Sequence, residues 1–213
     1  MTITEMKQAV LDMSKQSYEE KLFAGTSGNL SVRDPETGLI AITPGSVAYP
    51  TMTLEEVMVI TPDGEIREGT RKPSSEWRMH AEVYKHRPDV HAIVHTHSPY
   101  ATAFAVTHEN IPVILIEMMF FLLGDVPVAK YATPGTAELG SNALEVLGSR
   151  GACLLENHGV LAVGPTLERA HIRAVYTEDA AKICTLARQN GPINVMPLEE
   201  QNKMRRQMGI PEE

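Results

Sequence analysis

The 213-residue sequence has few of the features that mark secreted or membrane proteins. Its two cysteines, Cys153 and Cys184, are too few for a disulfide framework, and their apolar neighbours predict buried free thiols. No apolar run reaches the roughly 20 residues that span a bilayer, and the longest, IPVILIEMMFFLLG, contains Glu117. Residues 1–16 are typical of an amphipathic helix and not of a signal peptide. We therefore expect a cytoplasmic protein with no membrane partner.

Basic residues are also too scarce for a general nucleic-acid-binding protein. The chain has 19 Lys and Arg against 27 Asp and Glu, which gives a net charge of −8. A single small anion is still compatible with this balance, because a few local groups suffice to hold one phosphate. The composition, 43% hydrophobic and 22% charged, is typical of a globular protein, and the length fits one domain.

Hydrophobic patterning predicts helices and strands that alternate along the chain. Helices are expected over 3–23, 72–87, 98–108, 133–151 and 166–190, and strands within 30–34, 39–43, 57–69, 91–97 and 152–164. The segment 57–69 is predicted to be a hairpin that turns at Asp63-Gly64. The residues between IPVILIE and Pro127 are expected to form a loop, and the polar tail to contain at most one short helix. Hairpins mixed with crossover helices favour a single mixed sheet flanked by helices.

The stretch HAIVHTHSPY, residues 91–100, places three histidines close together. Side chains alternate along a strand, so His95 and His97 share one face, while His91 lies at the start of the strand. A third imidazole comes from His158 in LLENHGVLAVG, in a turn where Gly159 is expected to adopt an unusual backbone angle. Three protein ligands with an open position are typical of catalytic zinc. Spacing alone leaves this interpretation and a structural role for the histidines both open.

Glu76, in KPSSEWRMH, is the candidate acid or base. It follows Ser74 and Ser75 at the expected start of a helix, where free N–H groups and a partial positive charge favour an anion. The serines could therefore hold a phosphate while Glu76 faces the reacting carbon. The alternative is an ordinary helix cap with a carboxylate in its first turn. The loop GTSGN, residues 25–29, is a second segment whose backbone could approach an anion.

Six motifs in this order, GTSGNLSVR, AITPGS, KPSSEWRMH, AIVHTHSPYATAFA, YATPGT and LLENHG, resemble those of the class II aldolase/adducin family. The resemblance covers about residues 5–190 and is greatest to the L-fuculose-1-phosphate aldolase type. It implies one three-layer α/β/α domain over 1–194, with a mixed, largely antiparallel central sheet. It also implies a homotetramer with active sites between subunits, and a polar tail, 195–213, near the active site or a subunit interface.

The resemblance also implies roles for individual residues. His95, His97 and His158 would bind one Zn²⁺ per subunit, and Glu76 would ligate zinc at rest and transfer a proton during the reaction. The positions that match the family's phosphate site are Gly28, Asn29, Gly45, Ser46, Ser74 and Ser75. The implied reaction is the reversible aldol cleavage of a ketose 1-phosphate to dihydroxyacetone phosphate and an aldehyde.

Three departures from the family pattern concern the aldehyde. Ile116 stands at the position that matches the family's catalytic tyrosine. The next residue, Glu117, is either a polar group on the aldehyde side of the site or a helix-capping or salt-bridged residue. The tail after Met196 contains no Tyr, Phe or Trp. The usual T-P-x-G appears as T-P-G-S, with its glycine at Gly45 and a serine at Ser46.

Other functions remain as alternatives. An aldolase for another ketose 1-phosphate, such as 5-deoxyribulose 1-phosphate, or a methylthioribulose-1-phosphate dehydratase would use the same metal site. A pentulose-phosphate 4-epimerase is disfavoured because its acidic residue is matched by Phe120. A non-catalytic, adducin-like binding protein is disfavoured because the three histidines and Glu76 are all retained.

Overall fold

A computed structural model describes residues 1–212 of the protein. One eight-stranded sheet runs in the order β4-β3-β2-β1-β5-β8-β7-β6. Among the described residues, only β6 and β7 pair in parallel. The strands are β1 (Asn29–Arg33), β2 (Ile40–Ile42), β3 (Met58–Ile60), β4 (Ile66–Glu68), β5 (Ala92–Thr96), β6 (Val128–Ala129), β7 (Ala152–Leu155) and β8 (Gly159–Gly164).

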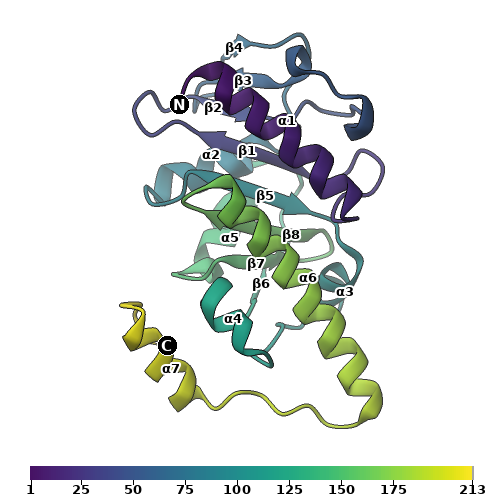
Figure 1. Ribbon diagram of the computed structural model, residues 1–213, viewed down its shortest axis with the longest axis vertical. Helices are drawn as coiled ribbons and strands as arrows, with labels where there is room; N and C mark the ends of the chain where they lie inside the picture. The colour runs from purple at the N-terminus through teal and green to yellow at the C-terminus, as the bar shows by residue number, and fades with distance from the viewer. Residues whose placement is uncertain (213) are drawn as a thin grey trace.

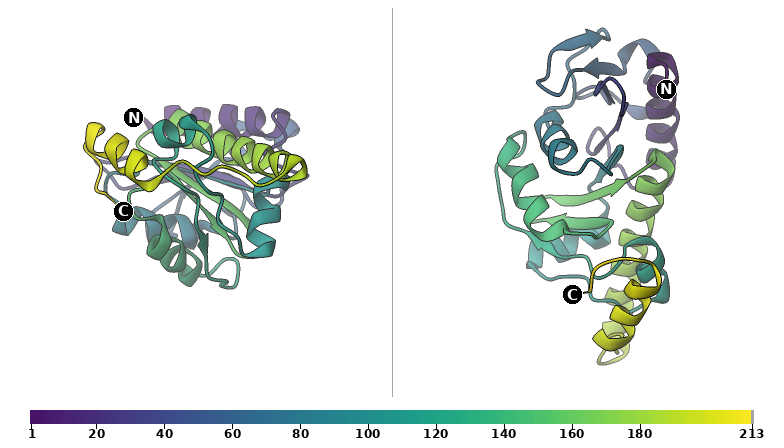
Figure 2. Two further views of the ribbon diagram at one scale, coloured as in Figure 1. Left: turned by 90° about the horizontal axis from the view of Figure 1, so that it is seen from below. Right: turned by 90° about the vertical axis from the view of Figure 1, so that its left-hand side faces the viewer.

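Helices cover both faces of this sheet (Figure 1). The helices are α1 (Ile3–Glu19), α2 (Trp77–His86), α3 (Pro99–Thr107), α4 (Ile116–Phe121), α5 (Ala137–Leu147), α6 (Leu167–Asn190) and α7 (Leu198–Gln207), with 3₁₀ turns η1 (Tyr49–Thr51) and η2 (Leu54–Glu56). Figure 2 shows α1 and α6 on one side of the sheet and α2 and α5 on the other. The predicted three-layer α/β/α fold with a largely antiparallel sheet is confirmed.

Alternation along the strands divides the core between the two faces. On β1, Leu30 and Val32 point into the cluster beneath α1 and α6, whereas on β5 Ile93 points into the cluster beneath α2 and α5. The β1 face toward α2 is different, since it carries Asn29 and Ser31, which are both buried. Buried polar side chains are costly unless they form hydrogen bonds, so Asn29 and Ser31 require polar partners on α2.

Several predicted boundaries were wrong for local reasons. Helix α1 ends at Glu19, because the chain turns at Lys21 with a φ of 64°. Helix α2 begins at Trp77, so Ser74 and Ser75 precede the helix. The helix expected over 133–151 spans only Ala137–Leu147. The predicted loop before Pro127 contains the six-residue α4, which is too short to give a clear helical period.

The C-terminal segment packs on the same chain. Helix α7 contacts α4 (Figure 1), and Arg205 donates to the carbonyl of Leu123 and to the hydroxyl of Ser149. Residue 213 of the predicted tail lies outside the described residues. Cys153 and Cys184 are buried and free, as predicted. Within residues 1–212, no helix combines the length and apolarity that crossing a membrane requires.

Candidate active site

The end of β5 places the first two histidines. His95 is fully buried, and its Nδ1 lies 2.8 Å from the carbonyl oxygen of Val160. That carbonyl can only accept, so Nδ1 carries a proton and Nε2 is the ring nitrogen that is left for a metal or another partner. His97 follows the last residue of β5, and its Nε2 lies 2.9 Å from that of His95. The two rings converge, as expected from their shared strand face.

The turn between β7 and β8 supplies His158. Its ring centroid is 4.7 Å from that of His95 and 4.9 Å from that of His97. The expectation about Gly159 was wrong, because the positive φ, 54°, belongs to Asn157. Gly159 is required for another reason: a Cβ there would overlap the carbonyl oxygen of Thr96. The missing side chain therefore lets this turn approach the end of β5 closely.

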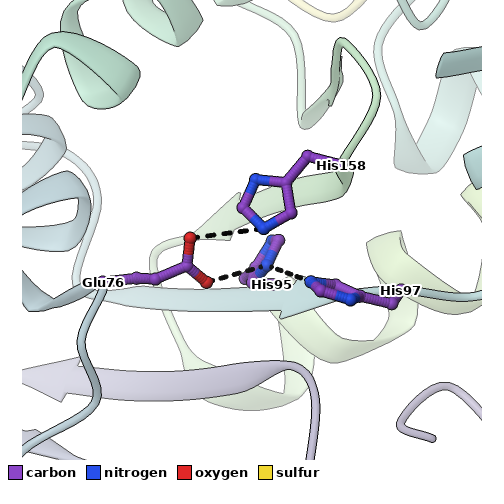
Figure 3. Close-up of side chains that lie close together, drawn as sticks. All are labelled: Glu76, His95, His97 and His158. Carbon is purple, nitrogen blue, oxygen red and sulfur yellow. Dashed lines mark hydrogen bonds and ion pairs between the residues drawn. The ribbon is translucent and has the colours of Figure 1, made fainter. Parts of the chain in front are cut away.

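Glu76 occupies the cap position before α2 and is buried (Figure 3). Its Oε2 accepts from the Nδ2 of Asn29 at 2.9 Å and lies 3.0 Å from the Nε2 of His95. Its Oε1 lies 3.3 Å from the Nε2 of His158 without a hydrogen bond. Glu76 thus faces the histidines, and one of its two oxygens is left without a hydrogen-bond partner.

Burial and mutual charge determine the protonation of this cluster. Burial raises the pKa of Glu76, but the adjacent His95 outweighs it, so the pKa of Glu76 is lowered overall. Burial lowers the pKa of His95, whereas the Glu76 carboxylate reverses this, so the pKa of His95 is raised. Burial, reinforced by His95, lowers the pKa of His97 and of His158 to about 4. At pH 7 Glu76 is therefore ionised, and His97 and His158 are neutral.

These four side chains could hold a metal ion. Glu76, His95, His97 and His158 each offer a ligand atom, and all four atoms lie within 4.8 Å of one another. Neutral imidazoles and a carboxylate are the donors that zinc accepts. The convergence of nitrogen lone pairs, together with the unpartnered Oε1 of Glu76, fits a cation between them. The donor set is thus compatible with a metal and leaves room for a fourth or fifth ligand from a substrate.

A cavity of about 500 Å³ opens beside the cluster. It is bordered by Glu76, His97 and His158, and by all six positions predicted for phosphate: Gly28, Asn29, Gly45, Ser46, Ser74 and Ser75. Some backbone donors on this wall are already used, since the N–H of Trp77 donates to the carbonyl of Ser74 and the N–H of Gly45 donates to the carbonyl of Lys72. Neither Ser46 nor Ser75 uses its N–H in a hydrogen bond with the described residues.

Sequence reasoning missed part of the cavity wall. Lys72 and Pro134 were not singled out, whereas Thr26 and Ser27, which also line the cavity, belong to the loop 25–29 that the sequence had indicated. Lys72 is the only lysine or arginine among the described lining residues. The signal for Lys72 was its position directly before the PSSE motif. A second hollow, of about 560 Å³, lies on another side of His97 and includes Tyr18, Phe23, Ala24 and Pro99.

Glu117 is not brought to the cluster within this chain. It lies in the first turn of α4, beside the half-exposed Ile116, and borders neither of the two hollows next to His97. His80 lies one turn beyond Glu76 on α2, is fully buried and bonds to Asn29. In the sequence, its spacing of four residues from Glu76 is the one signal that links His80 to the site.

Comparison with known proteins places the fold and cluster in a family. The model of the "Class II Aldolase and Adducin N-terminal domain" matches residues 8–185. The 5-methylthioribulose-1-phosphate/5-deoxyribulose-1-phosphate aldolase of Rhodospirillum rubrum is 37% identical over 93% of this chain and 89% of its own. The 5-deoxy-D-ribulose 1-phosphate aldolase of Bacillus thuringiensis serovar kurstaki is 34% identical over 96% and 95%. A solved L-fuculose 1-phosphate aldolase is 39% identical, with a TM-score of 0.92 over 99% of both chains.

The chain therefore belongs to the class II aldolase and adducin family. The family resemblance of the six motifs is confirmed, and so is the predicted enzyme class, a class II aldolase or carbon–carbon lyase. The similar relatives carry names for two different sugar types at comparable identity. Family membership thus defines the class of reaction more sharply than the substrate.

Proposed function

We propose that this protein catalyses the zinc-dependent, reversible aldol cleavage of a ketose 1-phosphate to dihydroxyacetone phosphate and an aldehyde. The observation that carries the proposal is one cavity that joins the Glu76–histidine cluster to small-residue loops and Lys72. An aldol cleavage needs a group that accepts the electron pair of the broken bond, a proton carrier and a phosphate anchor. Each has a candidate in the cavity wall.

His95, His97 and His158 would hold the zinc ion, with Glu76 as a further ligand before substrate enters. When bound, zinc supplies a Lewis acid for the negative charge that develops on the ketose oxygens as the carbon–carbon bond breaks. The hydrogen bond of His95 Nδ1 to Val160 keeps its Nε2 lone pair directed at the cluster. No lysine that forms a Schiff base is needed for this chemistry.

Glu76 would carry the proton. Glu76 borders the cavity, and Asn29 holds its Oε2 through the side-chain amide, while the buried Oε1 has no hydrogen-bond partner. We assign Oε1 to the proton at the carbon next to the ketose carbonyl. In the condensation direction the ionised Glu76 removes the proton from that carbon. In the cleavage direction the hydroxyl on the aldehyde-forming carbon loses its proton as the carbon–carbon bond breaks, and Glu76, once it has taken up a proton, delivers it to the carbon next to the ketose carbonyl.

The phosphate would bind between the loops that contain Gly28, Ser46 and Ser75. Free N–H groups of Ser46 and Ser75 are suitable donors, and Gly28 adopts a φ of 82° that a side chain would disfavour. The ammonium group of Lys72 adds a positive charge to this wall. Its exposed position suits a contact that selects phosphate esters over uncharged sugars and takes no part in the bond chemistry.

The aldehyde half decides between L-fuculose 1-phosphate, our first candidate, and 5-deoxyribulose 1-phosphate. Both sugars end in a methyl group, but the aldehyde from L-fuculose 1-phosphate carries an additional hydroxyl. Tyr18, Phe23, Ala24 and Pro99, in the second hollow beside His97, would suit the methyl end in either case. Glu19 and Lys21 also line this hollow and could bond the additional hydroxyl, so the lining suits either sugar. We keep 5-deoxyribulose 1-phosphate as the second candidate because two similar relatives carry its name.

Two measurements test the proposal. Purified protein is expected to contain about one zinc per chain by elemental analysis, and a chain that binds none after incubation with zinc would contradict it. Dihydroxyacetone phosphate release is then followed with fuculose, rhamnulose, 5-deoxyribulose and methylthioribulose 1-phosphates. Release from none of them, with a dehydrated or epimerised product instead, would favour the dehydratase or epimerase. The ratio of the release rates from fuculose 1-phosphate and 5-deoxyribulose 1-phosphate shows which aldehyde the enzyme prefers.

We also propose the homotetramer that the family resemblance implies. Helix α4 supports it, because Ile116 and Phe120 are 45% and 50% exposed on one short helix. Sedimentation velocity at micromolar concentration is expected to give a mass near four chains. A monomer at every concentration would leave Glu117 without a route to an active site and would remove it from the proposal.

A further inference from the structure

Polar side chains form a continuous row between β1 and α2. We call this row the β1–α2 seam; its members are Asn29, Ser31, Arg33, Glu76, His80 and Tyr84. Two residues along a strand advance about 6.7 Å, and four residues along a helix advance about 6 Å. Alternate strand residues can therefore remain opposite successive helical turns for the length of β1.

Short hydrogen bonds connect the seam from its middle to Glu76. The Nε2 of His80 lies 2.6 Å from the Oδ1 of Asn29, whose Nδ2 donates to Glu76 at 2.9 Å. On the other side of the ring, Nδ1 lies 2.7 Å from the Oγ of Ser31. Ser31 Oγ in turn lies 2.7 Å from the hydroxyl of Tyr84. All members of the seam are buried except Arg33, which is partly exposed.

The chemistry of these groups fixes the direction of the bonds. An ionised Glu76 only accepts, so Asn29 must turn its NH₂ toward it and its Oδ1 toward His80. An amide oxygen also only accepts, so the Nε2 of His80 must carry a proton. Burial lowers the pKa of His80 to about 3, so the ring is neutral at pH 7 and its Nδ1 accepts from Ser31. The hydroxyl of Tyr84 donates to the backbone carbonyl of Ser31 at 3.1 Å.

We propose that His80 is a positioning residue for the metal site: its Nε2–H fixes the amide of Asn29, which in turn orients the carboxylate of Glu76. This inference rests on the proposed function only in taking Glu76 as a metal ligand. A reversed amide would present Oδ1 to the carboxylate and repel it, which would turn Glu76 away from the histidines. His80 does not touch the cavity, so it acts through Asn29 alone.

A buried histidine can be purely structural, so the experiment must distinguish a structural role from a positioning role by measuring more than stability. A structural residue contributes to the free energy of unfolding, whereas a positioning residue also changes zinc affinity. Residues that orient metal ligands typically change metal affinity by 10- to 100-fold when they are replaced. Val83, on the same helix, is fully buried in the apolar core and supplies a matched control without polar contacts.

The first experiment measures zinc affinity by chelator competition, with Tm recorded for each variant. His80→Phe keeps a planar ring without the donor and is expected to weaken zinc binding about 10- to 100-fold. His80→Gln can donate to Asn29 again and is expected to restore affinity to within about threefold. Val83→Ala is expected to lower Tm and leave zinc affinity unchanged. Equal zinc affinities in His80→Phe and Val83→Ala would overturn the proposal.

A second measurement uses the unmodified chain and does not depend on a variant that folds. Nitrogen-15 NMR of the histidine rings reports which nitrogen of His80 carries the proton, with and without zinc. Protonated Nε2 and bare Nδ1 are expected in both states, and the opposite tautomer would overturn the proposal. Neither measurement uses aldol turnover, so an inactive enzyme that binds zinc would refute the proposed reaction and leave the role of His80 standing.

Discussion

The two ends of the β1–α2 seam hold opposite charges in different ways. At the C-terminal end of α2, Arg33 donates to the carbonyls of Tyr84 and Val90, each at 2.7 Å, and to that of Pro88 at 3.0 Å. These include carbonyls that the end of a helix leaves without partners. At the N-terminal end, Glu76 faces three imidazoles and keeps one oxygen without a hydrogen bond.

The two ends of β1 and α2 therefore serve different purposes: the Arg33 end contributes to stability and the Glu76 end to function. The charge of Arg33 is matched by carbonyls of its own chain, so its bonds stabilise the connection after α2. The charge of Glu76 is matched only in part, so the site keeps donor atoms for a metal and a substrate. The same strand and helix thus provide an anchored end and a reactive end.

Glu76→Gln tests the reactive end and should give the largest effect. The glutamine amide keeps the shape of the side chain but can neither take up nor release a proton at neutral pH. Turnover is therefore expected to fall about 10²- to 10⁴-fold. Circular dichroism should show a retained fold, and elemental analysis should show retained zinc content when zinc is supplied in excess, where the weaker affinity expected from loss of the carboxylate ligand does not limit occupancy. Turnover equal to that of the unmodified enzyme would remove Glu76 from the mechanism.

Arg33→Met tests the anchored end, where we expect loss of stability without loss of the site. Several charged bonds to carbonyls disappear, so the free energy of unfolding should fall by about 2–4 kcal/mol. Urea unfolding measures this, and zinc affinity should stay within about twofold. Arg33→Lys is the control for charge alone. A large drop in zinc affinity at unchanged stability would abolish the distinction between the two ends.

Acid should lower the Tm of the metal-free protein, because buried histidines at and near the reactive end of the seam take up protons more readily when the chain unfolds. Burial lowers the pKa of His80 to about 3 and those of His97 and His158 to about 4. Unfolding lets them return toward about 6.5 and take up protons, so their stabilising effect is present above pH 6.5 and is lost toward pH 4. Calorimetry in a chelator should show Tm falling over this range. His97→Gln should flatten the slope, and a Tm that rises on acidification would contradict the assignment.

Lys72→Met should give the smallest effect, in the cavity next to the reactive end. Loss of one charge beside the phosphate is expected to raise KM about tenfold and leave kcat within about twofold, because such a contact acts equally in ground and transition states. Steady-state kinetics on the best ketose 1-phosphate measures it. Lys85→Met, on an exposed part of α2, is the control. Equal KM values for both variants would exclude Lys72 from phosphate binding.

Local rules in the sequence predicted much of the fold, and several of the residues that they indicated lie close together in the structure. Strand alternation predicted that His95 and His97 share a face, and the turn of LLENHG brought His158 to them. The six phosphate positions, which came from the family motifs, all line one cavity. These features depend on short-range geometry or on ordered motifs, and both can be read without a structure.

The remaining features depend on contacts between distant segments. The need for Gly159 arises from Thr96, and the bonding of His80 arises from Asn29 and Ser31, about 50 residues earlier. Lys72 is a single exposed lysine before a proline, and it has no periodicity that would mark it. The position of Glu117 follows from a helix, α4, whose six residues are too few to show a pattern.

Because side chains alternate along β1, the length of this strand determines which of them face α2 and Glu76. Inserting or deleting one residue within Asn29–Arg33 would turn Leu30 and Val32 toward α2 and Asn29 toward the opposite core. Pairing with β2 and β5 could still form, but the carboxylate of Glu76 would lose its amide partner. We therefore expect homologous sequences to vary in length in the turn at 34–39 and to keep the length of β1 constant.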